Sequence, residues 1–127
     1  MAARTPRVPL TDIRDAIRRI ERYTKGQTST TFRKSELVRD AVERCIEIIS
    51  EASRRIPADL KARHPDIPWA KVAGVGNVFR HDYDEVHPPL VWEIVTEHLP
   101  ALHRAVNILL RETRKERRRV SAPKARR

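Results

Sequence analysis

The sequence has few of the residues that shape β-rich, disulfide-bonded or membrane-spanning proteins. Only three of its 127 residues are glycine, too few for the many positive-φ turns of a β-sandwich or barrel. A single cysteine cannot form an intramolecular disulfide or a cysteine-rich zinc site. No apolar run approaches the roughly 18 residues of a membrane span, and MAARTPRVPL lacks the apolar stretch of a signal peptide. We therefore expect an all-α protein of the cytoplasm.

Positive charge is abundant but unevenly distributed. The chain has 27 Lys+Arg and 17 Asp+Glu, a formal charge of +10, and +7 of it lies in residues 111–127. A segment of this kind raises nonspecific affinity for polyanions, and it serves equally well as a solubilising end. We expect one domain over residues 9–112, between a flexible N-terminus (1–8) and a disordered basic tail (113–127).

Two amphipathic helices are predicted in the first half of the chain. Apolar spacings of three and four predict a helix over residues 11–23, with one face formed by Leu10, Ile13, Ile17 and Ile20. A wider apolar stripe runs from Val38 to Ile56, with N-cap candidates in residues 28–31 and a proline after it. Cys45 lies on this stripe, so we interpret it as a buried structural thiol.

The second half of the chain completes a helical bundle. We expect a short helical turn over residues 58–63, a long helix over 68–80, and a last helix that begins near Pro88 and is kinked or restarted at Pro100. These elements predict an all-α, up-and-down bundle of four or five helices with an aliphatic core. The stripes of the first two long helices are wider than one bundle needs, which suggests a homodimer.

The sequence lacks the motifs of several enzyme classes. It has no glycine-rich phosphate loop, no His-Glu-x-x-His zinc helix and no nucleophile elbow. We interpret His98 and His103 as helix-surface residues, and His64 and His87, which each precede a proline, as loop residues. We accordingly expect neither a metal nor another cofactor.

One segment, GVGNVFRHDY at residues 74–83, combines glycines with polar residues. Each glycine inside a helix costs about 1 kcal/mol relative to alanine, so its presence suggests that another helix or a ligand comes close. Asn77 and His81 are four residues apart and share a helix face, and Arg80 can lean back over Gly76. An amide, a cation and a titratable base would then adjoin, although a polar helix end with cations near its C-terminus explains the spacing equally well.

The chain resembles the HepT-like branch of the HEPN superfamily. The resemblance follows the order EIISEA, ARHPDIPW and a glycine-containing helix leading into HDY, within residues 39–86. It extends through IRDAIRRIERYT before and VWEIVTEHLPAL after, from Ile13 to Leu110. It implies a four- or five-helix bundle that dimerises with its active sites near the dimer cleft. It also implies a metal-independent endoribonuclease, the toxin of a type VII-like toxin–antitoxin pair.

The family motif implies roles for individual residues. His81 matches the catalytic histidine, and Tyr83, two residues later, matches the tyrosine that an MntA-type nucleotidyltransferase antitoxin modifies with AMP. The family places an arginine four to six residues before the histidine, usually next to an asparagine, whereas Gly76 precedes Asn77 here. We therefore expect Arg80 to supply the cation, reaching back over Gly76, and Asn77 to position a phosphate or orient His81.

Three functions remain open from the sequence. The first is a ribonuclease toxin with His81, Arg80 and Asn77 as catalytic residues, which leaves a 2′,3′-cyclic phosphate and a 5′-OH and is silenced by AMP at Tyr83. The second is a HEPN dimer weakened by the missing arginine, which binds RNA, a nucleotide or the nucleotidyltransferase. The third, outside the family, is a basic helical nucleic-acid adaptor that acts through residues 111–127.

Overall fold

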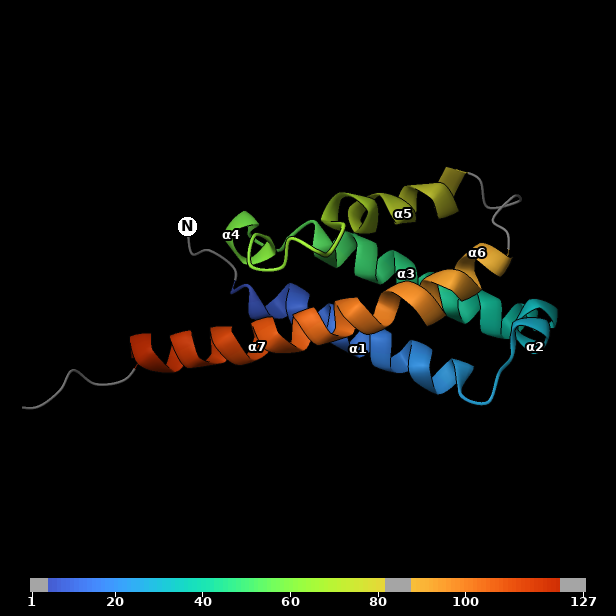
Figure 1. Cartoon of the computed structure of the whole chain (residues 1–127), viewed down its shortest axis with the longest axis horizontal. Coiled ribbons are helices and arrows are strands. Elements are labelled where there is room, and N and C mark those ends of the chain that lie inside the picture. Colours follow the sequence, from blue (N-terminus) through green and yellow to red (C-terminus); the bar gives the residue numbers. More distant parts are fainter. Residues whose placement is uncertain (1–4, 82–87, 122–127) are drawn as a thin grey trace, which may run out of the picture.

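Four long helices form the body of the protein (Figure 1). The computed structural model describes residues 5–81 and 88–121, which contain helices and no strand. The long helices are α1 (Arg7–Thr24), α3 (Glu36–Ser53), α5 (Trp69–His81) and α7 (Leu99–Ser121). Because α7 packs on α1, α1 on α3 and α3 on α5, the helices lie in that order across the bundle. Consecutive long helices run in opposite directions, which confirms the predicted all-α, up-and-down bundle.

Short elements connect the long helices: α2 (Ser29–Lys34), α4 (Ala58–Lys61), α6 (Pro88–Glu93) and the π-helical turn η1 (Ile94–His98). The expected short turn is α4, whereas α2 was not expected. Thr28 and Thr31 form a capping box that begins α2 rather than the following long helix. Ser35 has an extended backbone, and its hydroxyl accepts the N–H of Val38 at 3.2 Å. This cap separates α2 from α3.

The core is mostly aliphatic and includes the predicted apolar stripes, but it also contains the fully buried aromatic Phe32 of α2, which was not expected. Its fully buried members on the first two long helices include Leu10, Ile13, Ile17 and Ile20 of α1, and Val42, Cys45, Ile46 and Ile49 of α3. Burying each large aliphatic side chain stabilises the fold by about 1.5–3 kcal/mol, so the stripes decide which faces meet. The opposite faces are polar, and none of the described helices is long and apolar enough to cross a membrane.

Pro100 is accommodated by the π-helical turn. Proline has no N–H, and its ring clashes with the carbonyl of the residue four positions earlier, here Thr96. In the wider turn of η1, the N–H of Leu99 bonds to the carbonyl of Ile94, five residues back. The helical path therefore continues from α6 through η1 into α7, and the expected irregularity takes the form of a π turn.

Both ends of the bundle are more helical than expected. Helix α1 begins at Arg7, inside the segment predicted to be flexible, and Nη1 of Arg7 donates to the carbonyl of Leu110 at 2.6 Å. Helix α7 continues to Ser121, nine residues beyond the predicted end of the domain. Arg63 holds this extension through ion pairs of 3.1 Å to both Glu112 and Glu116. Helical structure therefore extends past residues 8 and 112, and contacts between residues distant in the sequence hold both ends.

Candidate active site

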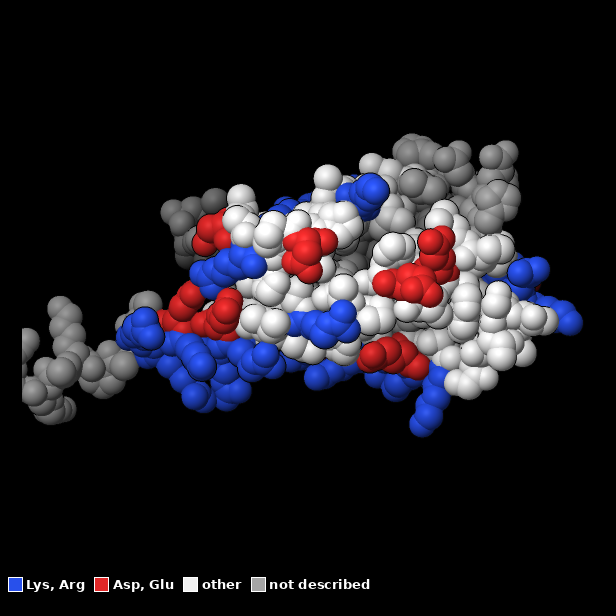
Figure 2. Space-filling model, viewed as in Figure 1, with Lys and Arg blue, Asp and Glu red and all other residues white. Residues whose placement is uncertain are grey.

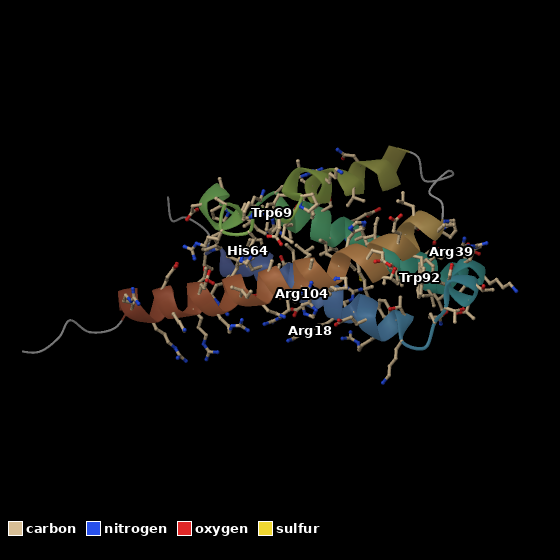
Figure 3. The ribbon with its side chains drawn as sticks, viewed as in Figure 1. Arg18, Arg39, His64, Trp69, Trp92 and Arg104 are labelled. Atoms are coloured by element: carbon tan, nitrogen blue, oxygen red, sulfur yellow. The ribbon has the colours of Figure 1, made fainter. Side chains whose placement is uncertain are left out.

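Helix α5 carries the candidate site and is anchored at its start by Trp69. The indole Nε1 donates to the carbonyls of Lys61 and His64, both at 3.1 Å. Trp69 and His64 lie next to each other where α4 leads into α5 (Figure 3). A buried indole N–H normally finds such a partner, and here the bonds fix the start of α5 against α4 and the loop that follows it.

Gly76 lies in the contact between α5 and α3. The hydroxyl of Ser50, which is 1% exposed, donates to the carbonyl of Ala73 at 2.7 Å and accepts the N–H of Gly76 at 3.1 Å. A Cβ on Gly76 would lie 2.9 Å from Oγ of Ser50, closer than real Cβ atoms approach, and a tight 3.1 Å from its Cβ. The glycine therefore lets the two helices meet, and Ser50 joins them.

The packing of α5 on α3 explains why position 76 is a glycine, without any role for Arg80. The prediction that another helix comes close to a glycine of this segment is confirmed, and that helix is α3. The space beside the Cα of Gly76, which we expected to be clear for a guanidinium, is occupied by Ser50. The side chain of Arg80 lies outside the described residues, so its reach toward His81 stays a prediction.

Arg54 places a cation beside α5 that the sequence analysis missed. Its Nη2 donates to the carbonyl of Ala73 at 2.9 Å and to Oδ1 of Asn77 at 3.5 Å, and its Nη1 lies 3.6 Å from Glu51. The side chain is 38% exposed, so its charge remains accessible to an anion. A sequence signal existed, because Ser50 and Arg54 are polar residues four apart within the span of the apolar stripe from Val38 to Ile56.

The predicted catalytic residues occupy the last turns of α5. Asn77 is exposed, and Asn77 and His81 lie one turn apart in a continuous helix, as predicted. The side chains of Arg80 and His81 are outside the described residues, and Tyr83 is outside them altogether, as is Asp82. Their chemical roles remain predictions that rest on the backbone placement and the motif.

The other candidate nucleophile and titratable residues lie away from this site. Cys45 is fully buried, and burial raises the pKa of its thiol, which confirms the structural interpretation. His98 is exposed on η1, whereas His103 is largely buried, with Nδ1 3.5 Å from Glu21 across the α1–α7 contact. His87 lies outside the described residues. In the described ranges, no group of three His, Cys, Asp or Glu residues is placed to hold a metal ion.

The described part of the site can bind an anion. Arg54, at the end of α3, offers a permanent cation, and Asn77 of α5 offers an amide. The face of α5 that carries Asn77 continues to position 81. Guanidinium and amide groups bind phosphate oxygens through charge-assisted and neutral hydrogen bonds. A histidine on the same face can move a proton to or from an oxygen held there.

The fold and the site define a class: an all-α, up-and-down bundle with a candidate acid–base site at the end of one helix. The chain belongs to the Ribonuclease HepT-like family, which matches it over residues 13–109. The match confirms the resemblance drawn from the sequence, and it includes α5 and most of the helices that surround it.

Curated relatives carry ribonuclease names. The "Probable ribonuclease HepT" of Thermococcus cleftensis is 39% identical over 93 residues, covering 73% of this chain and 84% of the relative. The "Putative RNase MJ1380" of Methanocaldococcus jannaschii is 33% identical over 109 residues, covering 86% of this chain and all of the relative. The "Putative RNase TTE0752" of Caldanaerobacter subterraneus is 28% identical over 109 residues, covering 86% and 97%. No solved structure matches the chain significantly.

Proposed function

We propose that this chain is an endoribonuclease toxin that cleaves RNA by acid–base chemistry without a metal ion. The observation that carries the proposal is the shared face of Asn77 and His81 at the end of α5, in a chain of the HepT-like family. The experiment that tests it is incubation of the purified chain with single-stranded RNA in EDTA. Products with a 2′,3′-cyclic phosphate and a 5′-OH support the proposal, and intact RNA contradicts it.

Each residue of the site has a defined role in this reaction. His81 takes the proton of the RNA 2′-OH or donates one to the leaving 5′-oxygen, so that the 2′-oxygen bonds to phosphorus as the 5′-oxygen departs. Arg80 stabilises the negative charge that builds on the phosphorane. Asn77 holds the phosphate or orients His81. No step requires a metal ion.

We extend the proposal to Arg54, because position 76 carries no arginine and Arg54 already contacts Asn77. Arg54→Ala is expected to lower kcat/KM for RNA about 10- to 100-fold, the effect of losing one charged hydrogen bond of about 1.5–3 kcal/mol. The rates are measured at equal amounts of folded protein, so that a loss of stability does not count as a loss of activity.

Arg55→Ala is the matched control for Arg54→Ala. Arg55 is adjacent, its side chain is 37% exposed, and it bonds to Asp12 on α1 at 3.3 Å rather than to α5. Arg54→Lys keeps the charge and should recover part of the activity. If Arg54→Ala and Arg55→Ala cleave equally well, Arg54 only supports the fold.

We propose that a nucleotidyltransferase antitoxin of the MntA type silences the enzyme by transferring AMP to Tyr83. Co-expression with such a partner is expected to add the mass of one AMP group to a peptide containing Tyr83, and to abolish RNA cleavage. Mass spectrometry of the digested protein checks the site. Tyr83→Phe should gain no mass and should escape silencing, whereas modification elsewhere in the chain would contradict the assignment.

We propose that the chain acts as a homodimer whose interface adjoins the site. Leu37 at the start of α3 and Leu90 on α6 are exposed, at 81% and 43%. The C-terminal end of α5 lies at this same end of the bundle (Figure 1). Exposed apolar side chains at the same end of the bundle as a candidate site are consistent with a contact between copies.

A second candidate function is supported by the glycine at position 76, where the family usually has an arginine. Without an arginine there, and with Ser50 filling the adjacent space, the chain can act as a catalytically weakened dimer that binds RNA, a nucleotide or the nucleotidyltransferase. RNA binding without cleavage by the unmodified purified protein would favour this function over the enzyme.

A further inference from the structure

The outer face of α7 carries a row of cations that faces away from the core. Buried positions such as Val106, Leu109 and Thr113 lie on the inner face of the helix. The opposite face presents the exposed side chains of Arg104, Arg111, Arg114, Lys115 and Arg118. The two glutamates of this helix, Glu112 and Glu116, lie on its flank and are held by Arg63. The helical periodicity therefore separates the charges and leaves an outer face without acidic residues.

Helix α1 extends this cationic face. Arg7 bonds to the carbonyl of Leu110, and Glu21 lies 3.5 Å from His103, so α1 and α7 run side by side in opposite directions. Arg18, exposed on α1, lies between these two contacts along the helix. Figure 2 shows blue side chains along the lower edge of the molecule, over the C-terminal half of α7, with red side chains on its upper flank. We name Arg18, Arg104, Arg111, Arg114, Lys115 and Arg118 the basic strip.

The cations of the basic strip are not held in ion pairs in the described part of the chain. None of its six cations forms one of the salt bridges found there. Arg111 and Lys115, like Arg114 and Arg118, are four residues apart on one helix, a spacing at which like charges repel by about 0.2–0.5 kcal/mol per pair. A bound polyanion would relieve this repulsion and release its own condensed counterions.

The chemistry of the strip favours a phosphate backbone over a protein partner. Protein interfaces usually contain an apolar centre. Among the described residues, the exposed large apolar side chains are Val8, Leu37 and Leu90, and none belongs to the strip. From Arg104 to Arg118 the strip spans about 21 Å of helix axis, a length that several consecutive phosphates of an extended strand can follow.

The strip lies across the bundle from the candidate active site. Helices α1 and α3 separate α7 from α5 in the packing order, and α5 and the outer edge of α7 lie on opposite sides in Figure 1. A contact on the strip therefore holds RNA without touching the atoms that react. Its contribution should appear in binding and in KM rather than in kcat.

We propose that the basic strip binds the phosphate backbone of RNA, independently of base sequence, as a site separate from the α5 site. The choice of RNA among polyanions rests on the proposed function. Helix α7 aligns the cations over 104–118 on one face and continues to Ser121, within the segment expected to be a disordered tail.

The test compares two triple variants of the full chain that lose the same charge. Arg104→Gln, Arg111→Gln and Arg118→Gln together remove half of the strip, while Lys25→Gln, Arg33→Gln and Lys34→Gln remove three exposed cations around α2. Affinity for a single-stranded 2′-O-methyl RNA, which lacks the attacking hydroxyl, is measured at several salt concentrations. The strip triple should lose at least about tenfold in affinity at low salt. Its log–log salt slope should shrink by about 2, because each lost contact on a single strand contributes about 0.7.

Each outcome of this test is decisive. The α2 triple should bind within about twofold of the unmodified chain; equal losses in both triples, or an unchanged salt slope in the strip triple, overturn the proposal. Loss of nucleotidyltransferase binding with RNA binding intact would instead assign the strip to an acidic protein. Cleavage of a dinucleotide, too short to reach the strip, should be unchanged in the strip triple. If the unmodified chain binds RNA with the expected salt dependence but cleaves none, the proposed ribonuclease function is contradicted, whereas the proposal that the basic strip binds RNA still holds.

Discussion

Replacing His81 by alanine is expected to lower the rate of RNA cleavage at least about 100-fold, the usual contribution of one positioned acid or base. The imidazole at the end of α5 is the one group of the proposed site that can both accept and donate a proton near neutral pH. The binding of 2′-O-methyl RNA should change little, because the basic strip and Arg54 are untouched. Single-turnover cleavage and binding, measured on the same preparation, separate the two effects.

His98→Ala provides the control for His81→Ala. His98 is exposed on η1, its side chain is 64% exposed, and it lies 4.0 Å from Glu93 on the neighbouring turn. It is outside α5, so its loss should leave cleavage within about twofold. Cleavage by His81→Ala at the unmodified rate, in a preparation free of contaminating nuclease, would remove the catalytic assignment while leaving the family membership intact.

The fold could be read from the sequence wherever the information was local. Leu10 and Ile13 repeat at helical spacing, so their burial followed from the pattern alone. The ends of helices were less predictable. Helix α7 reaches Ser121 with help from Arg63, which is 49 residues away from Glu112. Pro100 predicted an irregularity in the last helix, but the spacing of residues did not specify that it takes the form of a π turn.

The candidate site also combines features that local residue spacing predicts with features that depend on contacts between helices. The spacing of Asn77 and His81 follows from the helix that contains them, so their common face was predictable. Ser50 and Arg54 reach α5 from α3, across 26 and 23 residues of chain. Their part in the site depends on how two helices pack, which residue spacing does not specify. The glycine in α5 did signal a close neighbour, and only the structure identifies that neighbour as Ser50.

The two glycines of α5 should respond in opposite ways to the same substitution. Gly74→Ala is expected to stabilise the protein by about 0.5–1 kcal/mol, because alanine favours a helix and its Cβ would meet nothing within 4 Å. Gly76→Ala is expected to destabilise it by about 1–3 kcal/mol, because overpacking against Ser50 exceeds the helical gain. Denaturant unfolding of the two variants, with the unmodified chain as reference, measures the difference.

Removing the Ser50 side chain should reverse the effect of Gly76→Ala on stability, from destabilising to neutral or stabilising. Ser50→Gly takes away both the hydroxyl and the Cβ that a new side chain would meet, although the substitution itself lowers stability by breaking the bonds to Ala73 and Gly76. In that background, Gly76→Ala should be neutral or stabilising, which gives a coupling between the two positions of at least about 1 kcal/mol.

The same contact predicts that Gly76→Arg, which restores the family's usual arginine, will restore or raise activity only if Ser50 is made smaller as well. A Gly76→Ala variant as stable as Gly74→Ala would show that α3 and α5 do not meet as closely at this point as the Ser50–Gly76 contact requires.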